Sequence, residues 1–273
     1  MVRDPLRKTI VGGVVLAVAA LFVAAPSFAA ETKKFSVGLG MNFATGDYGT
    51  DSTTDSLRVP FTLDYFPTER LDFELVIPYL YQSNSNTILA GGTRFPFERH
   101  GGMRQTSFDT SDSQSGLGDI SLTAGYLLLT RSETLPSVRA LLYLKFPTAD
   151  EDEGLGTGEF DIGAGIGAAK WYGLWYTFAE GRYIFQGSNS DLGLKDYGTL
   201  EGKLGYRMTE RFLPTISLWW STPPADDASD LVEARLNGTY WITDDVFLEG
   251  YLGKGLSDET ADFGAGLAVF YRF

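Results

Sequence analysis

The 273-residue sequence contains no cysteine and only one histidine. Without cysteine the chain has no disulfide framework, thiolate metal site, cysteine nucleophile or lipid attached to an N-terminal cysteine. A single histidine cannot form a histidine-clustered metal site within one chain. Basic residues are also few: 22 Lys and Arg stand against 35 Asp and Glu, and the formal net charge is −13. An acidic chain repels phosphates, so nucleic acid is not expected as a partner.

The sequence also lacks long apolar runs, except for the uncharged residues 10–25. Basic residues precede this run, and Ser27 and Ala29 provide the small side chains of a cleavage site after Ala29. The run is shorter than the roughly 20 residues that a membrane-spanning helix needs. We therefore predict that residues 1–29 are a cleaved secretory signal peptide and that residues 30–273 form the exported mature chain.

From Lys33 onward, apolar residues recur at every second position in twelve segments. Successive side chains of a β-strand point to opposite faces, so this alternation predicts strands with one apolar face. The predicted strands cover residues 35–43, 57–65, 71–81, 120–128, 138–146, 160–168, 175–185, 200–206, 212–220, 232–242, 246–252 and 263–273.

The connections between these segments alternate in length. Outer-membrane barrels combine short periplasmic turns with longer external loops in this way. We therefore predict an all-β fold: a single transmembrane antiparallel up-and-down β-barrel of about 12 strands, in the outer membrane of a Gram-negative bacterium. The short turns are 67–70, 131–135, 170–173, 208–211 and 243–245, and the longer polar loops are 44–55, 83–117, 148–158, 187–196, 221–230 and 256–261.

A soluble sandwich or a lipocalin-like barrel is the competing interpretation. Two features favour the membrane barrel. The second face of the predicted strands carries Gly, Ser and Thr with scattered charges, as expected for a wet interior. Aromatic residues also gather near strand ends, for example Tyr65 and Trp175 at the turns and Tyr79, Phe185 and Trp219 toward the loops. This placement predicts the two aromatic girdles of a lipid-embedded barrel.

The chain ends on Val269-Phe270-Tyr271-Arg272-Phe273, which alternates up to a final aromatic residue. This ending resembles the C-terminal signal by which bacterial outer-membrane barrels are handed to their assembly machinery. The resemblance implies that Tyr271 and Phe273 act as the assembly signal. The expected partners are the barrel assembly machinery, outer-membrane lipid, lipopolysaccharide and a small-molecule solute.

A barrel of this size has a narrow interior. Twelve tilted strands give a backbone diameter of roughly 24 Å, and inward side chains then leave room for a small solute at most. Charged residues on the inner face have two interpretations: they pair across the lumen and make it rigid, or unpaired ones form a selectivity path. The lumen-lining candidates are Arg58, Asp64, Asp72, Glu74, Asp119, Arg139, Lys145, Asp161, Glu180, Arg182, Glu201, Lys203, Arg207, Glu233, Arg235 and Glu249, and Arg272 has the same parity.

Catalytic chemistry is not indicated. His100, the only histidine, lies in the 83–117 loop without a serine nucleophile beside it. The acidic run from Asp150 to Gly154 lacks the spacing of an EF-hand. We therefore predict no enzyme activity, no cofactor and no specific metal site. Divalent ions held loosely between loop carboxylates and lipopolysaccharide phosphates are left open.

Two motif regions indicate a family. Gly116-Leu117-Gly118-Asp119-Ile120 enters a predicted strand, and the run from Leu144 to Asp150 is followed by Gly154 to Gly158 and by Asp161-Ile162-Gly163. Together they resemble the outer-membrane proteins, labelled transporters, that are named for the phenol meta-cleavage degradation pathway. Ala149 replaces the glycine of that family's Pro-Thr-Gly-Asp run. The resemblance implies a barrel that serves catabolism of aromatic compounds or hydrocarbons and admits hydrophobic small molecules.

Two features bear on how open the lumen is. Gly163, Gly165 and Gly167 alternate on the inner face of one predicted strand, which opens room in the lumen or accepts a closely packed loop. The long, aromatic 83–117 loop either folds inward as a constriction or stays outside the barrel.

Three functions are compatible with the sequence. The first is a channel in which small hydrophobic or aromatic solutes cross a narrow lumen by passive diffusion. The second is a structural or adhesive barrel without transport. The third, with the least support, is an outer-membrane barrel hydrolase.

Overall fold

The computed structural model describes residues 33–48, 53–83, 87–89, 96–98, 113–189, 192–226 and 228–273. The predicted signal peptide, residues 1–29, and most of the 83–117 loop with His100 lie outside these residues. In the described part of the chain, all regular structure is β-strand. That part contains no helix long and apolar enough to cross a membrane.

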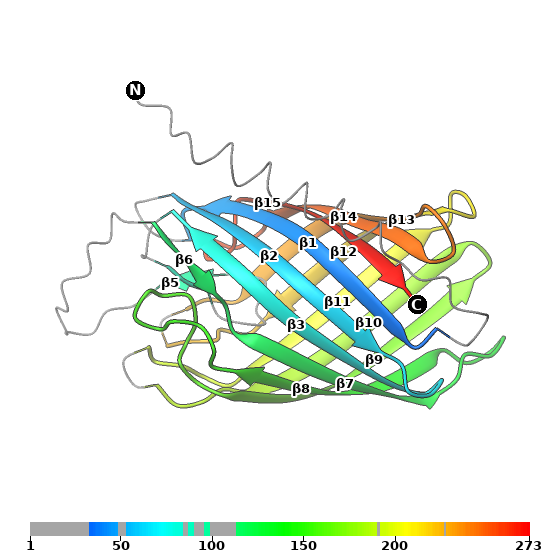
Figure 1. Cartoon of the computed structure of the whole chain (residues 1–273), viewed down its shortest axis with the longest axis horizontal. Coiled ribbons are helices and arrows are strands. Elements are labelled where there is room, and N and C mark those ends of the chain that lie inside the picture. The colour runs from blue at the N-terminus through cyan, green and yellow to red at the C-terminus, as the bar shows by residue number, and fades with distance from the viewer. Residues whose placement is uncertain are drawn as a thin grey trace, which may run out of the picture.

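Twelve long antiparallel strands form one closed sheet (Figure 1). Neighbours along the chain pair with each other, and β1 also pairs with β15, which closes the ring. The strands are β1 (Phe35–Gly46), β2 (Thr54–Tyr65), β3 (Leu71–Gln82), β7 (Ile120–Leu129), β8 (Ser137–Phe146), β9 (Asp161–Tyr172), β10 (Trp175–Phe185), β11 (Tyr197–Tyr206), β12 (Phe212–Ser221), β13 (Leu231–Trp241), β14 (Val246–Gly255) and β15 (Phe263–Arg272).

Three shorter strands complete the sheet structure. The strand β6 (Gln114–Leu117) pairs with the second half of β3, and β7 pairs with the first half. Gly118 and Asp119 separate β6 from β7, so the two form one interrupted strand of the barrel. The strands β4 (Thr87–Leu89) and β5 (Pro96–Glu98) pair with each other in a separate small sheet.

Every predicted strand segment coincides with a barrel strand, so the predicted twelve-stranded antiparallel barrel is confirmed. One turn differs from the prediction. The turn expected at 170–173 lies later, because β9 continues to Tyr172 and the chain reverses at Gly173 and Leu174. Gly173 has a φ of 61°, a left-handed conformation that glycine adopts without steric cost.

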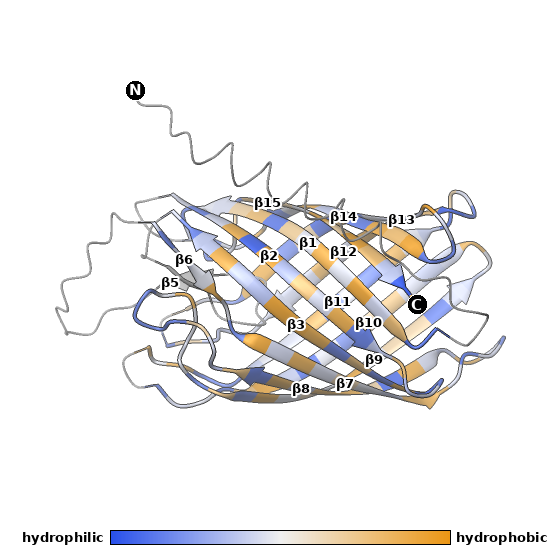
Figure 2. Cartoon of the chain, in the orientation of Figure 1, coloured by the Kyte–Doolittle hydropathy of each residue, from blue (hydrophilic) through white to orange (hydrophobic). Residues whose placement is uncertain are grey.

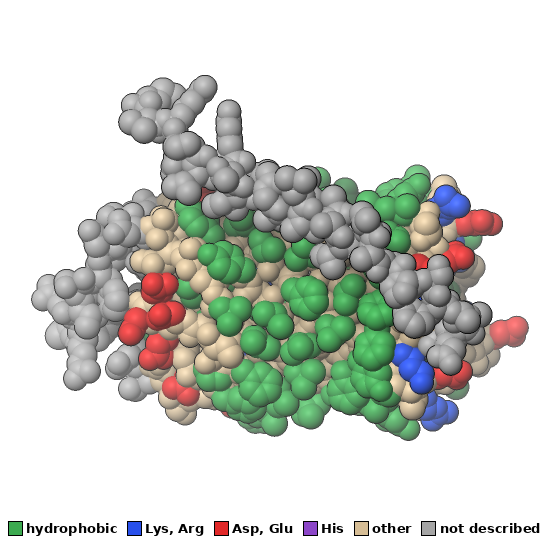
Figure 3. Space-filling model, viewed as in Figure 1, with side chains coloured by type: hydrophobic (Ala, Val, Ile, Leu, Met, Phe, Trp, Pro, Cys, Tyr) green, Lys and Arg blue, Asp and Glu red, His purple; other side chains and the backbone are tan. Residues whose placement is uncertain are grey.

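The two ends of the barrel differ. The short turns and the C-terminus lie at one end, which we call the turn end, and the longer connections lie at the other, the loop end (Figure 1). Between them the outer face is apolar: Ile166, Ile216 and Leu236 each expose 56–58% of their surface. Hydropathy alternates along the strands (Figure 2), and hydrophobic side chains form a band with charged residues beyond it (Figure 3). Such a band fits the hydrocarbon of a membrane.

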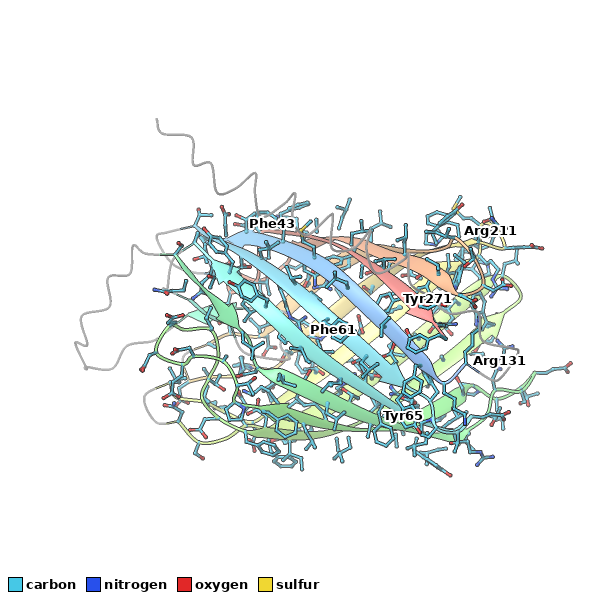
Figure 4. The ribbon with its side chains drawn as sticks, in the orientation of Figure 1. Phe43, Phe61, Tyr65, Arg131, Arg211 and Tyr271 are labelled. Atoms are coloured by element: carbon cyan, nitrogen blue, oxygen red, sulfur yellow. The ribbon has the colours of Figure 1, made fainter. Side chains whose placement is uncertain are left out.

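Aromatic side chains mark both borders of this band. Tyr65 and Tyr271 lie toward the turn end and Phe43 toward the loop end (Figure 4). At the turn end, the ring of Phe35 stacks on those of Tyr65 and Phe273, with centroids 4.8 and 5.8 Å apart. Phe35 and Phe273 also exchange two backbone hydrogen bonds. The end of the chain thus closes the barrel, and the role of Tyr271 and Phe273 as an assembly signal stays a prediction.

Trp219 does not belong to the outer girdle, contrary to the prediction. Its side chain is only 7% exposed and pairs in register with the buried Glu201, whereas Trp220 pairs with the outward Leu200. Ser217 and Trp219 both point to the inner face of β12. The alternation of side chains along the strand thus decides the direction of Trp219, and its aromatic character does not.

The largest of the fully shielded side chains lie at the loop end and not halfway along the barrel. Each belongs to a loop-end connection or to the loop-end part of a strand. The outer mouth is therefore the best-packed region of the molecule. The large side chains with less than 2% exposure are Tyr48, Thr54, Gln82, Asp119, Lys145, Leu155, Thr157, Asp161 and Leu231.

Candidate functional site in the barrel lumen

A cavity of about 270 Å³ lies inside the barrel, and we call it the lumen cavity. Strands β2 and β11 face each other across it, since six pairings separate them in either direction around the ring. Side chains from opposite walls therefore converge on one space. The lining residues are Arg58, Pro60, Thr62, Glu74, Val76, Ser121, Thr123, Tyr143, Glu180, Arg182, Ile184, Tyr197, Thr199, Glu201 and Trp219.

One part of the lining is apolar and rigid. Tyr143, Ile184 and Tyr197 pack together as a buried cluster contributed by β8, β10 and β11. Trp219 of β12 lies further along the same lining. Three aromatic rings thus face a small interior space, which suits contact with another ring.

The glycine row of β9 serves this lining. A Cβ atom on Gly165 would lie 2.8 Å from Cγ of Arg182, and one on Gly167 would lie 3.2 Å from Oε2 of Glu180. The side chains of β10 therefore occupy the space that the β9 glycines leave. Among the described residues, the row makes room for neighbouring side chains of the wall.

The other part of the lining is charged. Arg182 Nε donates a hydrogen bond of 2.7 Å to Oε1 of Glu180. Glu74 faces the cavity with an accessible side chain and lies in the electrostatic field of both Arg182 and Arg139. Arg58 approaches from β2. The cavity thus combines charges of both signs with an aromatic wall.

Three ion pairs lie along the barrel wall, and we call Glu180–Arg182, Glu201–Lys203 and Glu233–Arg235 the wall pairs. In each, the two partners stand two residues apart on one strand and so share its inner face. Lys203 Nζ lies 3.3 Å from Oε2 of Glu201 and Arg235 Nη2 lies 3.0 Å from Oε2 of Glu233.

A further pair joins two strands: Arg139 of β8 binds Asp72 of β3, with Nε to Oδ1 at 3.0 Å. Gly125 of the intervening β7 lies beneath this guanidinium, where a side chain would collide with it. These ion pairs run along the wall and do not cross the lumen, in contrast to the predicted pairing across it.

Four further lumen candidates, Asp64, Arg207, Glu249 and Arg272, lie nearer the turn end. Arg207 is one residue beyond β11, and its guanidinium stacks on the ring of Trp171 at 4.2 Å. Asp64 and Glu249 both lie in the electrostatic field of Arg272, which itself lies 4.7 Å above the ring of Phe247.

A buried cluster lies at the outer mouth. It consists of Asp119, Lys145, Thr157 and Asp161, and we call it the mouth cluster. Lys145 Nζ lies 2.8 Å from Oδ2 of Asp161, 3.5 Å from Oδ2 of Asp119 and 2.6 Å from Oγ1 of Thr157. The second carboxylate oxygens accept backbone hydrogen bonds from Ala149 and Gly187. This buried lysine is therefore paired with two carboxylates that are themselves hydrogen-bonded.

Thr157 brings the β8–β9 loop, residues 147–160, into the mouth. Leu155 of this loop is fully buried, and a Cβ atom on Gly116 of β6 would lie 2.9 Å from its Cδ1 atom. Gln82 Nε2 donates to the backbone oxygen of Glu153 at 3.4 Å. The loop thus contacts β3 and β6 inside the barrel wall.

The mouth cluster explains the two motif regions of the sequence. Asp119, Lys145 and Asp161 were assigned to the inner face by parity, but their common contact with Thr157 was not predicted. Among the described residues, the 147–160 loop, which the sequence predicts as the polar loop 148–158, turns inward at Leu155 and Thr157. His100 and most of the 83–117 loop lie outside the described residues. In the described ranges no three carboxylate or histidine side chains converge to hold a metal ion.

The closed barrel, its apolar outer band and its polar interior define an outer-membrane β-barrel of a Gram-negative bacterium. A family model described as "Putative MetA-pathway of phenol degradation" matches residues 71–273. This match covers most of the chain, and the chain belongs to that family.

Solved structures share the fold. The COG4313 outer membrane channel from Pseudomonas putida F1 superposes with a TM-score of 0.67 at 20% identity, over 92% of this chain and 100% of that one. The translocator domain of autotransporter NalP from Neisseria meningitidis has a TM-score of 0.50 at 12% identity, over 98% and 96%. The KdgM porin has a TM-score of 0.50 at 10% identity, over 87% and 99%. These relatives are described as a channel, a translocator domain and a porin, none of them an enzyme. No curated protein sequence matches significantly.

Proposed function

We propose that the protein is an outer-membrane channel through which small aromatic solutes with a polar substituent, such as phenols, cross by passive diffusion. The lumen cavity carries this proposal, because it places an aromatic wall and charged groups around one small space inside a membrane barrel. The family description names phenol degradation, and the relative from Pseudomonas putida F1 is described as an outer membrane channel.

The size of the cavity supports a single-ring solute. An apolar cavity of about 150 Å³ is enough to hold benzene. The lumen cavity, at about 270 Å³, has room for one substituted ring. Tyr143, Tyr197 and Trp219 offer ring faces and edges for the offset or edge-on contacts that aromatic pairs prefer.

The charges narrow the solute class further. A pure hydrocarbon would displace water from Arg58, Glu74 and Arg182 without replacing the hydrogen bonds of that water, which is costly. A phenolic hydroxyl can donate to a carboxylate and accept from a guanidinium. The lining therefore favours a ring with a polar group over an unsubstituted hydrocarbon.

Current block in planar bilayers tests this proposal. Wild-type protein should carry a small ionic current that phenol reduces in a concentration-dependent manner. Trp219→Ala should raise the phenol concentration needed for half block by about tenfold, because an aromatic contact is lost. Trp220→Ala is the matched control. The Trp220 side chain follows Trp219 in the strand and faces outward, so phenol should block this variant at the same concentration as the wild type.

Equal block in the two tryptophan variants would contradict binding in the lumen cavity. Passive diffusion is tested separately with phenol uptake into protein-loaded vesicles, where the flux should follow the concentration gradient and reverse with it. A protein that carries neither current nor solute flux would favour the structural or adhesive barrel.

A further inference from the structure

We propose that Lys145 anchors the β8–β9 loop inside the outer mouth, and that this loop is the constriction that limits which solutes reach the lumen cavity. The second half of this inference rests on the proposed channel function, whereas the anchoring does not. The anchoring and the constriction are both inferred from the contacts of the mouth cluster and from its position next to the lumen cavity.

Lys145 binds the wall and the loop at the same time. Its ammonium group contacts Asp161 at the start of β9 and Asp119 next to β7, and it donates to Thr157 of the loop. All these side chains are buried. A buried ammonium group stays with its carboxylates because an unpaired buried charge is costly. The hydrogen bond to Thr157 therefore ties the loop to a fixed point of the wall.

The mouth cluster borders the lumen cavity on its loop-end side. Ser121 and Tyr143 line the cavity, and Asp119 and Lys145 are the next inward positions of the same two strands toward the loop end. Two residues of a strand span roughly 7 Å. The loop that Lys145 holds thus lies on the loop-end side of the cavity, from which external solutes would arrive.

Besides Lys145, hydrogen bonds of Thr148 and Ala149 hold the start of the loop, and Gln82 binds the backbone oxygen of Glu153. Leu155 is its one fully buried apolar side chain, while Asp150, Glu151 and Asp152 are exposed at the loop end. Like charges repel one another, and a segment with few buried apolar contacts opens locally at low cost. Without the anchor, the loop should leave the mouth.

The absence of cysteine from the chain allows a direct test. Leu155→Cys places a single thiol on the buried position of the loop, and a membrane-impermeant maleimide reports its exposure in protein reconstituted into vesicles. Thr157→Val removes the loop contact and leaves Lys145 with both carboxylates, so it should accelerate labelling by about tenfold. Lys145→Met should accelerate it more strongly.

Lys195→Met is the matched control. Lys195 also lies at the loop end and pairs with Asp226, but both side chains are exposed. Its loss should leave the labelling rate unchanged. The heat-dependent shift of the folded barrel on gels confirms folding for each variant, and Thr157→Val keeps the test valid should Lys145→Met fail to fold.

Single-channel conductance of the same variants tests the constriction. Faster labelling together with higher conductance supports both halves of the proposal. Faster labelling with the conductance of the wild type overturns the constriction, and unchanged labelling in folded Thr157→Val and Lys145→Met overturns the anchor. Faster labelling in proteins that never conduct supports the anchor and overturns the channel function itself.

Discussion

The mouth cluster and the wall pairs Glu180–Arg182 and Glu201–Lys203 both join acidic to basic side chains on the inner face, but their basic side chains differ in exposure to water. The third wall pair, Glu233–Arg235, is itself largely buried. The side chains of Lys145 and Asp119 have no exposure, whereas those of Lys203 and Arg182 keep 30% and 28%. All these side chains point to the inner face of their strands, so the alternation of faces does not explain the difference in exposure. The β8–β9 loop does, because it contributes Thr157 to the cluster and covers it, whereas Glu180 and Arg182 line the lumen cavity.

The barrel thus has an outer mouth from which water is excluded and a lumen that water can enter. In a soluble protein the packed core lies at the centre, but in this barrel the largest fully buried side chains lie at the outer mouth. Removing one partner of a buried ion pair is strongly destabilising, whereas an ion pair exposed to water contributes little to the free energy of unfolding. The predictions below test this contrast.

The largest effect is expected from Lys145→Met. The substitution leaves Asp119 and Asp161 as uncompensated buried carboxylates and should lower the free energy of unfolding by about 3–5 kcal/mol. Lys203→Met, on the same inner face, should lower it by about 1 kcal/mol or less. Urea unfolding in phospholipid vesicles, followed by tryptophan fluorescence, measures both. Equal losses in the two variants would show that the mouth is as wet as the lumen.

A second effect comes from Tyr48, a fully buried residue of the β1–β2 connection. Burial, the largest cause, raises the pKa of its hydroxyl well above the usual value, and nearby carboxylates act in the same direction. The folded state therefore keeps the proton that the unfolded state releases, and this contribution to stability is lost as the pH rises above about 10.

Tyr48→Phe should remove this pH dependence. Between pH about 10 and about 11 the free energy of unfolding of the wild type should fall by up to about 1.4 kcal/mol more than that of the variant. The other tyrosines contribute equally to both proteins, so the difference isolates Tyr48. Parallel pH profiles of the two proteins would mean that water reaches this hydroxyl.

The sequence predicts the lumen better than the outer mouth. Period-two alternation located all twelve strands, because each has one apolar face, and the same parity placed Lys145 and Asp161 inward. It could not show that Lys145 meets Thr157, since that contact depends on the path of a glycine-rich loop without periodicity. Trp219 was assigned to the outer girdle because it is aromatic, although Ser217 and Ser221, which share its face of the strand, are polar.

The smallest effect is expected from salt. The Lys203 side chain is 30% exposed, so ions screen its pair with Glu201, and the coupling energy from a double-mutant cycle of Glu201→Gln and Lys203→Met should fall from about 0.5 kcal/mol toward zero between about 0.01 and about 1 M salt. The coupling of Lys145 with Asp161 should stay constant, because ions do not enter the covered mouth. A salt-dependent coupling at Lys145 would mean that the β8–β9 loop is open much of the time, and the contrast between mouth and lumen would then be lost.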